Sequence, residues 1–200
     1  MEQTITIYCK NTRAYHEVPR GISLIQLKDL LKIQMPFPII AAHVNYKVEN
    51  LDFLLYKPKD VEFLDASSPS GMRAYVRTLD MVLSCAVNEL FPEMDLRVEH
   101  PISKGYYCTL QWHQDKEADP DDEKEPPVVT REMVKAIKER MKLIIAENRP
   151  IIEEEKQTKE VIRMFAERYN NESSIFEALG NPYCRYFRMG DFIDYYTNVL

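Results

Sequence analysis

The sequence predicts an α+β fold made of a small first domain and a larger second one. Short segments in which apolar and polar residues alternate, as they do in half-buried strands, occur in both halves of the 200-residue chain. Longer segments with apolar residues at helical spacing lie between these strands, and the turn-rich stretch 65–71 (DASSPSG) separates the two halves. We therefore expect one domain at 1–66, a linker at 67–71 and a second domain at 72–200.

The first domain shows the element order of a small ubiquitin-like β-grasp domain. Ser23 is a favourable N-cap, because its hydroxyl can accept a hydrogen bond from an N–H group of the helix that follows. The expected elements are strands at 3–8 and 14–18, a helix that follows Ser23 and is ended by Pro36 and Pro38, and strands at 39–44 and 61–64.

The second domain is expected to place helices on an antiparallel sheet. Thr130 can cap a helix that runs through Glu147, and the apolar residues at helical spacing within it are typical of a face that packs in a core. The expected elements are helices at 72–91, 131–147 and 157–169, a short helix capped by Ser173 or Ser174, strands at 96–99, 106–112 and 150–152, and a final hairpin of 183–189 and 192–196.

Charge is unevenly distributed along the chain. The net charge is −6 at pH 7, and the segment 115–125 alone contributes −5, with seven carboxylates against two lysines. An acidic run of this kind is usually a solvated loop, so we expect a loop at 113–127, with phosphate or metal binding as a minor alternative. The remainder is close to neutral and shows no strong basic stripe, which does not favour tight nonspecific binding of nucleic acid.

Composition also bears on the cellular compartment. No run approaches the roughly 20 apolar residues of a membrane span, and the N-terminus lacks the pattern of a signal peptide, so no membrane partner is expected. The four cysteines are far apart in the sequence, which favours free thiols over disulfides or a metal site. Free thiols are typical of the reducing cytosol, so the expected location is cytoplasmic. The apolar last residues, YYTNVL, suggest that the natural chain continues.

Short motifs in both halves follow the order and spacing of a known family. They are IAAHVN at 40–45, LDFL at 51–54, VEFL at 61–64, LSCAVNELFP at 83–92, GYY at 105–107, VTRE at 129–132 and FID at 192–194. In these motifs the chain resembles the N-terminal region of threonyl-tRNA synthetases over nearly its whole length. The resemblance implies a TGS domain, which is a β-grasp module, followed by an editing domain of the type shared with alanyl-tRNA synthetases.

The editing domain of that family holds a metal ion with two histidines on its first helix and a later Cys-x-x-x-His pair. When the motifs that end at Pro92 and Asp194 are aligned, the four ligands are replaced by Arg77, Met81, Tyr196 and Leu200. An arginine is always cationic, and a thioether is a poor ligand for a borderline ion. The resemblance therefore implies an editing site without a metal and without catalytic activity.

The same pair of domains without editing ligands also resembles the front of bacterial nucleoside kinases of the uridine kinase type. That resemblance implies a noncatalytic regulatory or binding region, partnered by a C-terminal P-loop kinase domain beyond residue 200. ATP and Mg²⁺ would then serve only the parent kinase, because this chain has no G-x-x-x-x-G-K-[ST] motif, and no cofactor is expected for the chain itself. The alternatives are the N-terminal region of a divergent threonyl-tRNA synthetase, a tRNA-editing hydrolase or an RNA-binding module.

Five residues are candidates to line a remnant pocket that binds RNA or a nucleotide. The arginine could hold an anion, although an ion pair with a nearby carboxylate is the commoner role for such a residue. The tyrosines could stack on a nucleobase, although more often such rings fill a sheet–helix interface. The candidates are Arg77, Met81, Tyr106, Asp194 and Tyr196.

Overall fold

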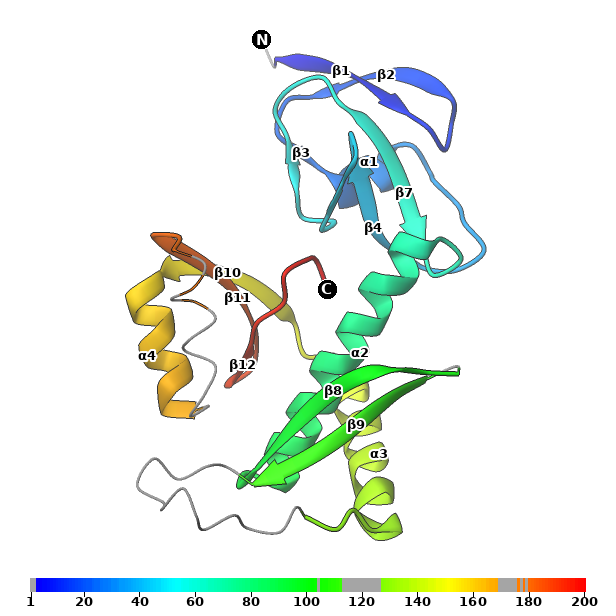
Figure 1. Cartoon of the computed structure of the whole chain (residues 1–200). Coiled ribbons are helices and arrows are strands. Elements are labelled where there is room, and N and C mark those ends of the chain that lie inside the picture. The colour runs from blue at the N-terminus through cyan, green and yellow to red at the C-terminus, as the bar shows by residue number, and fades with distance from the viewer. Residues whose placement is uncertain (1–2, 104, 113–126, 169–175, 177, 179) are drawn as a thin grey trace. The chain divides into compact units, whose positions relative to one another are not determined.

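The computed structural model describes residues 3–103, 105–112, 127–168, 176, 178 and 180–200 (Figure 1). Residue contacts divide the chain into two compact units: unit 1 comprises residues 1–79 with 196–200, and unit 2 comprises residues 80–195. The acidic loop predicted at 113–127 lies, except for its last residue, outside the described residues, and so do the serines predicted to cap a short helix. Among the described helices, none has the length and apolar character that a transmembrane span requires.

Unit 1 is built on a five-stranded sheet in the order β2-β1-β7-β4-β5. The central strands β1 and β7 run parallel, and the other neighbouring strands run antiparallel. The strands are β1 (Thr4–Cys9), β2 (Ala14–Pro19), β4 (Ile39–Val44), β5 (Lys47–Glu49) and β7 (Asp60–Asp65), with a separate pair formed by β3 (Ile22–Ser23) and β6 (Leu54–Leu55). These strands follow the order predicted for the first domain.

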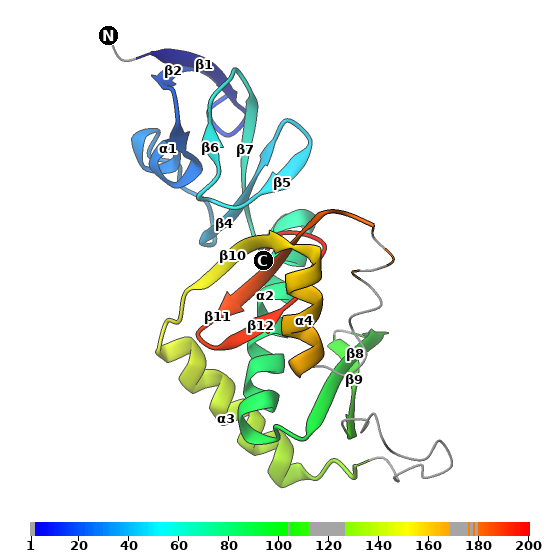
Figure 2. The ribbon, with the colours of Figure 1, turned by 90° about the vertical axis from the view of Figure 1, so that its left-hand side faces the viewer.

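Helix α1 (Leu24–Leu30) packs on one face of this sheet (Figure 2). Leu24 and Leu27 are fully buried in a core that they share with apolar side chains of the central strands. Ser23 caps the helix as predicted. Its hydroxyl accepts a hydrogen bond from the Gln26 N–H, and the Gln26 side chain accepts one from the Ser23 N–H, which completes a capping box.

Helix α1 ends before Pro36, so the prediction that the prolines end it is wrong. Lys32 adopts a left-handed conformation with φ +50°. Its N–H donates to the carbonyl oxygen of Asp29 at 3.2 Å, and the Ile33 N–H donates to that of Lys28 at 3.1 Å. This pair of hydrogen bonds is a Schellman motif, which ends a helix by reversing the chain direction and needs no proline.

Helix α2 (Pro69–Leu90) begins inside the stretch predicted as a linker. The Ser68 hydroxyl accepts a hydrogen bond from the Gly71 N–H at 3.0 Å, and Pro69 occupies the first helical position, where its missing N–H costs nothing. A Cβ added to Gly71 would lie 2.0 Å from the Asp65 carbonyl oxygen, so only glycine fits there. The serine, proline and glycine that indicated a linker therefore form the start of a helix, while the domain boundary at 67–71 stays a prediction.

Unit 2 contains the antiparallel sheet β10-β11-β12 and a separate hairpin of β8 and β9. Helix α4 lies against one face of the sheet, where Val161 and Phe165 pack with Tyr186 (Figures 1 and 2). Besides the second part of α2, its elements are β8 (Met94–Ile102), β9 (Gly105–Trp112), α3 (Arg131–Ala146), β10 (Ile151–Gln157), α4 (Thr158–Arg168), β11 (Tyr183–Met189) and β12 (Phe192–Asp194). Helices packed on mainly antiparallel sheets confirm the predicted α+β class.

Strand β10 is longer than the strand predicted at 150–152. It continues through three consecutive glutamates, and cations of the neighbouring strand β11 pair with them. Arg185 Nη1 lies 3.2 Å from Glu153 Oε1, and Arg188 Nη2 lies 2.7 Å from Glu154 Oε1. Opposite charges on paired strands stabilise a ladder that the charge run alone would disfavour.

Candidate functional site

Arg77 stands at the first of the four positions that the resemblance aligns with metal ligands, and its guanidinium binds a backbone carbonyl group. Its Nε donates a hydrogen bond to the Val199 carbonyl oxygen at 2.9 Å. Both residues belong to unit 1, where Val199 is buried in the last segment of the chain. A guanidinium carries only donors, so this group binds a carbonyl or an anion and does not bind a metal ion.

The other replaced positions also do not fit a zinc site. Met81 is completely buried and presents only a thioether. Leu200 has no ligating side-chain atom, and Tyr196 carries a phenol that is normally neutral. Structural and catalytic zinc sites use thiolate, imidazole and carboxylate groups, none of which stands at these four positions. In the part of the chain that the structure describes, no three His, Cys, Asp or Glu side chains gather as a metal site.

A small pocket of about 40 Å³ lies within unit 2, where α2, β8 and β12 meet. Ser84 and Asn88 line it from α2, one helical turn apart, and Asp95 and Asp194 line it from β8 and β12. The other lining residues are Val87, Met94 and Leu96. A space of this size holds a water molecule or a small ion but not a nucleoside.

Of the five predicted site residues, only Asp194 lines this pocket. Its Oδ1 accepts a hydrogen bond from the Tyr195 N–H at 2.7 Å. Tyr106 lies on β9 with half of its surface exposed, and Tyr196 is partly buried in the last segment. Binding of RNA or a nucleotide by the five residues stays a prediction.

The aromatic side chains near the candidates show both of the roles considered for them. Tyr195 packs edge-on against Phe176, with ring centroids 4.9 Å apart, so it fills the core of unit 2. Tyr107 is half-exposed on the β8–β9 hairpin, and its ring lies 5.5 Å from that of His100. The exposed faces of such a ring pair are accessible for stacking against a binding partner.

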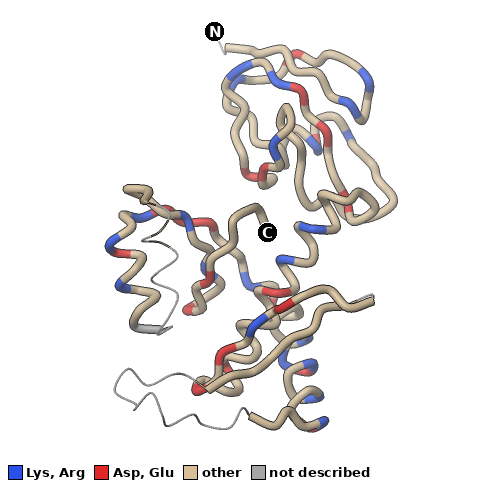
Figure 3. Tube along the Cα trace, viewed as in Figure 1, with Lys and Arg blue, Asp and Glu red and all other residues tan. Residues whose placement is uncertain are grey.

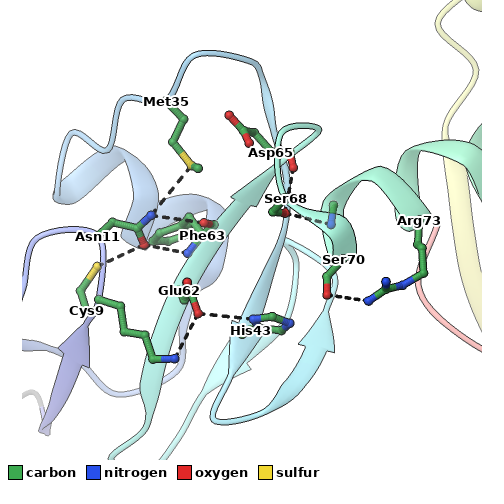
Figure 4. A network of polar contacts seen from close by, with 12 residues as sticks. Cys9, Asn11, Met35, His43, Glu62, Phe63, Asp65, Ser68, Ser70 and Arg73 are labelled. Atoms are coloured by element: carbon green, nitrogen blue, oxygen red, sulfur yellow. Dashed lines mark hydrogen bonds and ion pairs between the residues drawn. The ribbon is translucent and has the colours of Figure 1, made fainter.

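The open face of the unit 1 sheet carries a network of polar contacts (Figure 4). Lys10 Nζ lies 3.1 Å from Glu62 Oε2, and His43 Nδ1 lies 3.4 Å from the same oxygen. Partial burial works against ionisation of Glu62, but the hydrogen bonds from Lys10 and His43 outweigh it, so the pKa of Glu62 is lowered. The network joins β7 to β4 and to the residue that follows β1, and its partly exposed groups are typical of a surface ion-pair cluster.

A second charged cluster joins α2 to α3 within unit 2. Glu89 accepts hydrogen bonds from Arg140 and from Arg149, the latter at 2.6 Å. Glu147 accepts from the same two arginines, at 3.1 Å from Arg140 and 2.5 Å from Arg149. Shared partners of this kind cost less side-chain entropy than isolated pairs, because each arginine is already held by one bond when it makes the next.

The sequence reasoning missed one charged surface. Helix α3 carries four exposed cations on one side, so the statement that the chain shows no basic stripe needs correction (Figure 3). Their spacing of i, i+4, i+7 and i+11 was visible in the sequence, but the apolar stripe of the same helix gave the stronger signal. The four are Arg131, Lys135, Lys138 and Lys142.

No family model matches the chain. Its sequence is, however, similar to threonine–tRNA ligases of several bacteria. It is 28% identical to that of Syntrophomonas wolfei over 152 residues, which are 76% of this chain and 22% of the relative. It is 25% identical to that of Clostridium perfringens over 178 residues, 89% of this chain and 26% of the relative. It is 27% identical to that of Clostridium kluyveri over 194 residues, 95% of this chain and 28% of the relative.

The chain thus spans about a quarter of the length of these relatives. They support the threonyl-tRNA synthetase resemblance and give no support to a nucleoside kinase parent, so the kinase stays a prediction without support. Over most of its length, this chain is similar to the TGS and editing-like region of threonyl-tRNA synthetases.

Proposed function

We propose that this chain is a tRNA-binding region of a threonyl-tRNA synthetase-like protein, in which the editing reaction has been lost. The observation that carries the proposal is the similarity to threonine–tRNA ligases over 76% to 95% of the chain. Because the chain spans about a quarter of those relatives, aminoacylation would belong to other parts of a longer protein, and those parts would be its partner.

The contacts of two residues at the predicted ligand positions support the loss of editing. Arg77 donates to a backbone carbonyl, and Met81 is part of the buried core. Neither can bind a metal that would activate water, and no other chemistry for hydrolysing an ester bond is apparent from their side chains. The region therefore serves to bind and position tRNA rather than to cleave an aminoacyl bond.

Binding can be measured by the fluorescence anisotropy of a labelled tRNAThr transcript titrated with the chain. We expect a dissociation constant in the micromolar range at low salt that weakens steeply as salt rises, because phosphate contacts release counterions. A single-stranded DNA of equal length is the matched polyanion. Absence of tRNA binding at about 50 mM salt, or equal affinity for both polymers, would contradict the proposal.

A further inference from the structure

The cations of α3 form a continuous stripe along one side of the helix. Arg131, Lys135, Lys138 and Lys142 are spaced so that they fall within one narrow arc, and all four are exposed. From the first to the last, the stripe covers eleven residues of helical rise, or about 16 Å. Figure 3 shows the basic residues of α3 along this helix.

The opposite side of α3 fixes the stripe in its outward orientation. Ile137 and Ile144 are buried, and they lie roughly opposite the cations at 100° per residue. Glu89 holds Arg140 from α2, so the helix is attached through its buried side. The cations therefore sit on a rigid element and point away from its attachment.

Few carboxylates compete for these cations. Lys142 Nζ lies 2.8 Å from Glu139 Oε1, whose pKa is lowered by that hydrogen bond. Among the residues that the structure describes, no carboxylate lies within ion-pair distance of Arg131, Lys135 or Lys138. The helix has five cations against two carboxylates, a net charge of +3, in a chain whose net charge is −6.

We propose that this stripe contacts the phosphate backbone of a double-helical segment of tRNA; the proposal rests on the tRNA-binding function proposed above. A duplex carries about one negative charge per 1.7 Å of its axis, so a 16 Å stripe meets several phosphates. Helix α3 contains no aromatic residue, and it therefore offers no ring on which an unpaired base could stack. Backbone contact with a duplex fits this surface better than recognition of a single strand.

An anionic membrane is the competing partner for a basic helix. Helices that bind membrane surfaces insert a broad apolar face beside their cations. The apolar face of α3 is used inside unit 2, through Ile137 and Ile144. Three apolar side chains of α3 are exposed, but Val134 and Ile145 flank the stripe while Leu143 lies on another side of the helix, so they make no continuous apolar face. The charge pattern therefore favours nucleic acid.

The test uses the double variant Lys135→Gln/Lys138→Gln in the whole chain, titrated against labelled tRNAThr at several salt concentrations. Glutamine keeps the helix propensity of lysine, and circular dichroism checks the fold. The matched control is Lys159→Gln/Arg163→Gln on α4, which removes the same charge from two other exposed positions. Lys135→Arg/Lys138→Arg retains the charge on α3.

We expect the α3 glutamine variant to bind several-fold more weakly and to lower the slope of log affinity against log salt by about one for each lost contact. The α4 control and the arginine variant should bind like the unsubstituted chain. If the unsubstituted chain binds tRNA and the α3 variant matches it in affinity and slope, the stripe is not the contact. Equal weakening of tRNA binding by the α3 and α4 variants would also overturn this proposal. So would an α3 glutamine variant that loses binding to phosphatidylserine vesicles but still binds tRNA like the unsubstituted chain. If the unsubstituted chain fails to bind tRNA at all, the proposed function fails first.

Discussion

The Arg77 Nε donates a hydrogen bond to the Val199 carbonyl oxygen, at 2.9 Å and across 122 residues of sequence. The bond ties helix α2 to the last segment of the chain within unit 1. By the resemblance described above, the corresponding helix and segment of a threonyl-tRNA synthetase would contribute ligands to one metal ion. Here a hydrogen bond from a cationic guanidinium to a neutral carbonyl oxygen joins them instead, which gives the Arg77 side chain a structural role.

Replacing Arg77 should loosen the last segment. Arg77→Leu removes a hydrogen bond that a charged donor makes in a partly buried setting, with an expected loss of about 1–2 kcal/mol in the free energy of unfolding. Amide hydrogen exchange of residues 196–200 should accelerate. The control is Arg73→Leu, one turn earlier, where the exposed guanidinium donates a hydrogen bond to the Ser70 hydroxyl. Equal protection of the last segment in both variants would exclude the proposed tie.

Gly71 should tolerate no side chain. Helix propensity alone predicts that Gly71→Ala stabilises α2 by up to about 1 kcal/mol. The new Cβ, however, would lie 2.0 Å from the Asp65 carbonyl oxygen and 2.7 Å from its carbon, and a backbone neighbour cannot move aside as a flexible side chain can. We expect a net loss of about 2 kcal/mol or more, measured by urea unfolding.

Gly105→Ala is the matched glycine control. No atom lies within 4 Å of a Cβ placed on Gly105, so its effect should stay within about 0.5 kcal/mol. A stabilised Gly71→Ala chain would show that the start of α2 shifts at little cost.

The Glu89 cluster should contribute a salt-sensitive stability. Partial burial opposes ionisation of Glu89, but hydrogen bonds from Arg140 and Arg149 outweigh it and lower its pKa. Glu89→Gln leaves both arginines with one fewer carboxylate, and about 1 kcal/mol should be lost at low salt and less at high salt, where charges are screened. The surface pair of Glu139 and Lys142 offers the comparison, because Glu139→Gln should change the urea midpoint very little.

Glu154 and Tyr186 should make stability depend on pH at both ends of the scale. The Tyr186 hydroxyl, at 2.5 Å, and the Arg188 guanidinium donate to Glu154 and lower the pKa of its carboxyl. Because the folded pKa lies below the unfolded one, this stabilisation is present above the unfolded value near 4.3 and is lost as pH falls through the folded pKa.

The phenol behaves in the opposite sense. Burial and the hydrogen bond to Glu154 raise the pKa of Tyr186 to about 12. Its stabilisation is therefore full below the unfolded value near 10 and is lost as pH rises from there toward 12. Urea midpoints of the chain and of Tyr186→Phe, followed between about pH 3 and 12, should approach each other at both extremes. A constant difference across that range would mean that the pair is not coupled to ionisation.

Much of the fold follows from local sequence signals. The Ser23 and Thr130 caps were predictable because each hydroxyl precedes an apolar helical pattern, and the structure confirms hydrogen bonds to Gln26 and Met133. The end of α1 was not predictable in the same way. It depends on Lys32 adopting a left-handed conformation, which is unusual for a residue other than glycine or asparagine.

The candidate site was less accessible to sequence reasoning because its contacts join distant residues. The ligand positions came from the family resemblance, yet the partner of Arg77 lies at Val199, which no local pattern indicates. The full length of β10 was not predictable from local sequence either, since the arginines that pair with its glutamates come from a strand 30 or more residues later. The spacing of the α3 cations was visible in the sequence. Only the structure shows that the opposite side of the helix is buried, so that the cations form one exposed stripe.

The measurement that tests the central claim most directly is single-turnover hydrolysis of seryl-tRNAThr by an excess of the chain, with binding followed in the same samples. Our account predicts that the tRNA is bound while the ester decays at its uncatalysed rate, with or without added Zn²⁺. Hydrolysis above that background that a zinc chelator abolishes would contradict it, because a catalytic metal site would then exist in spite of Arg77 and Met81.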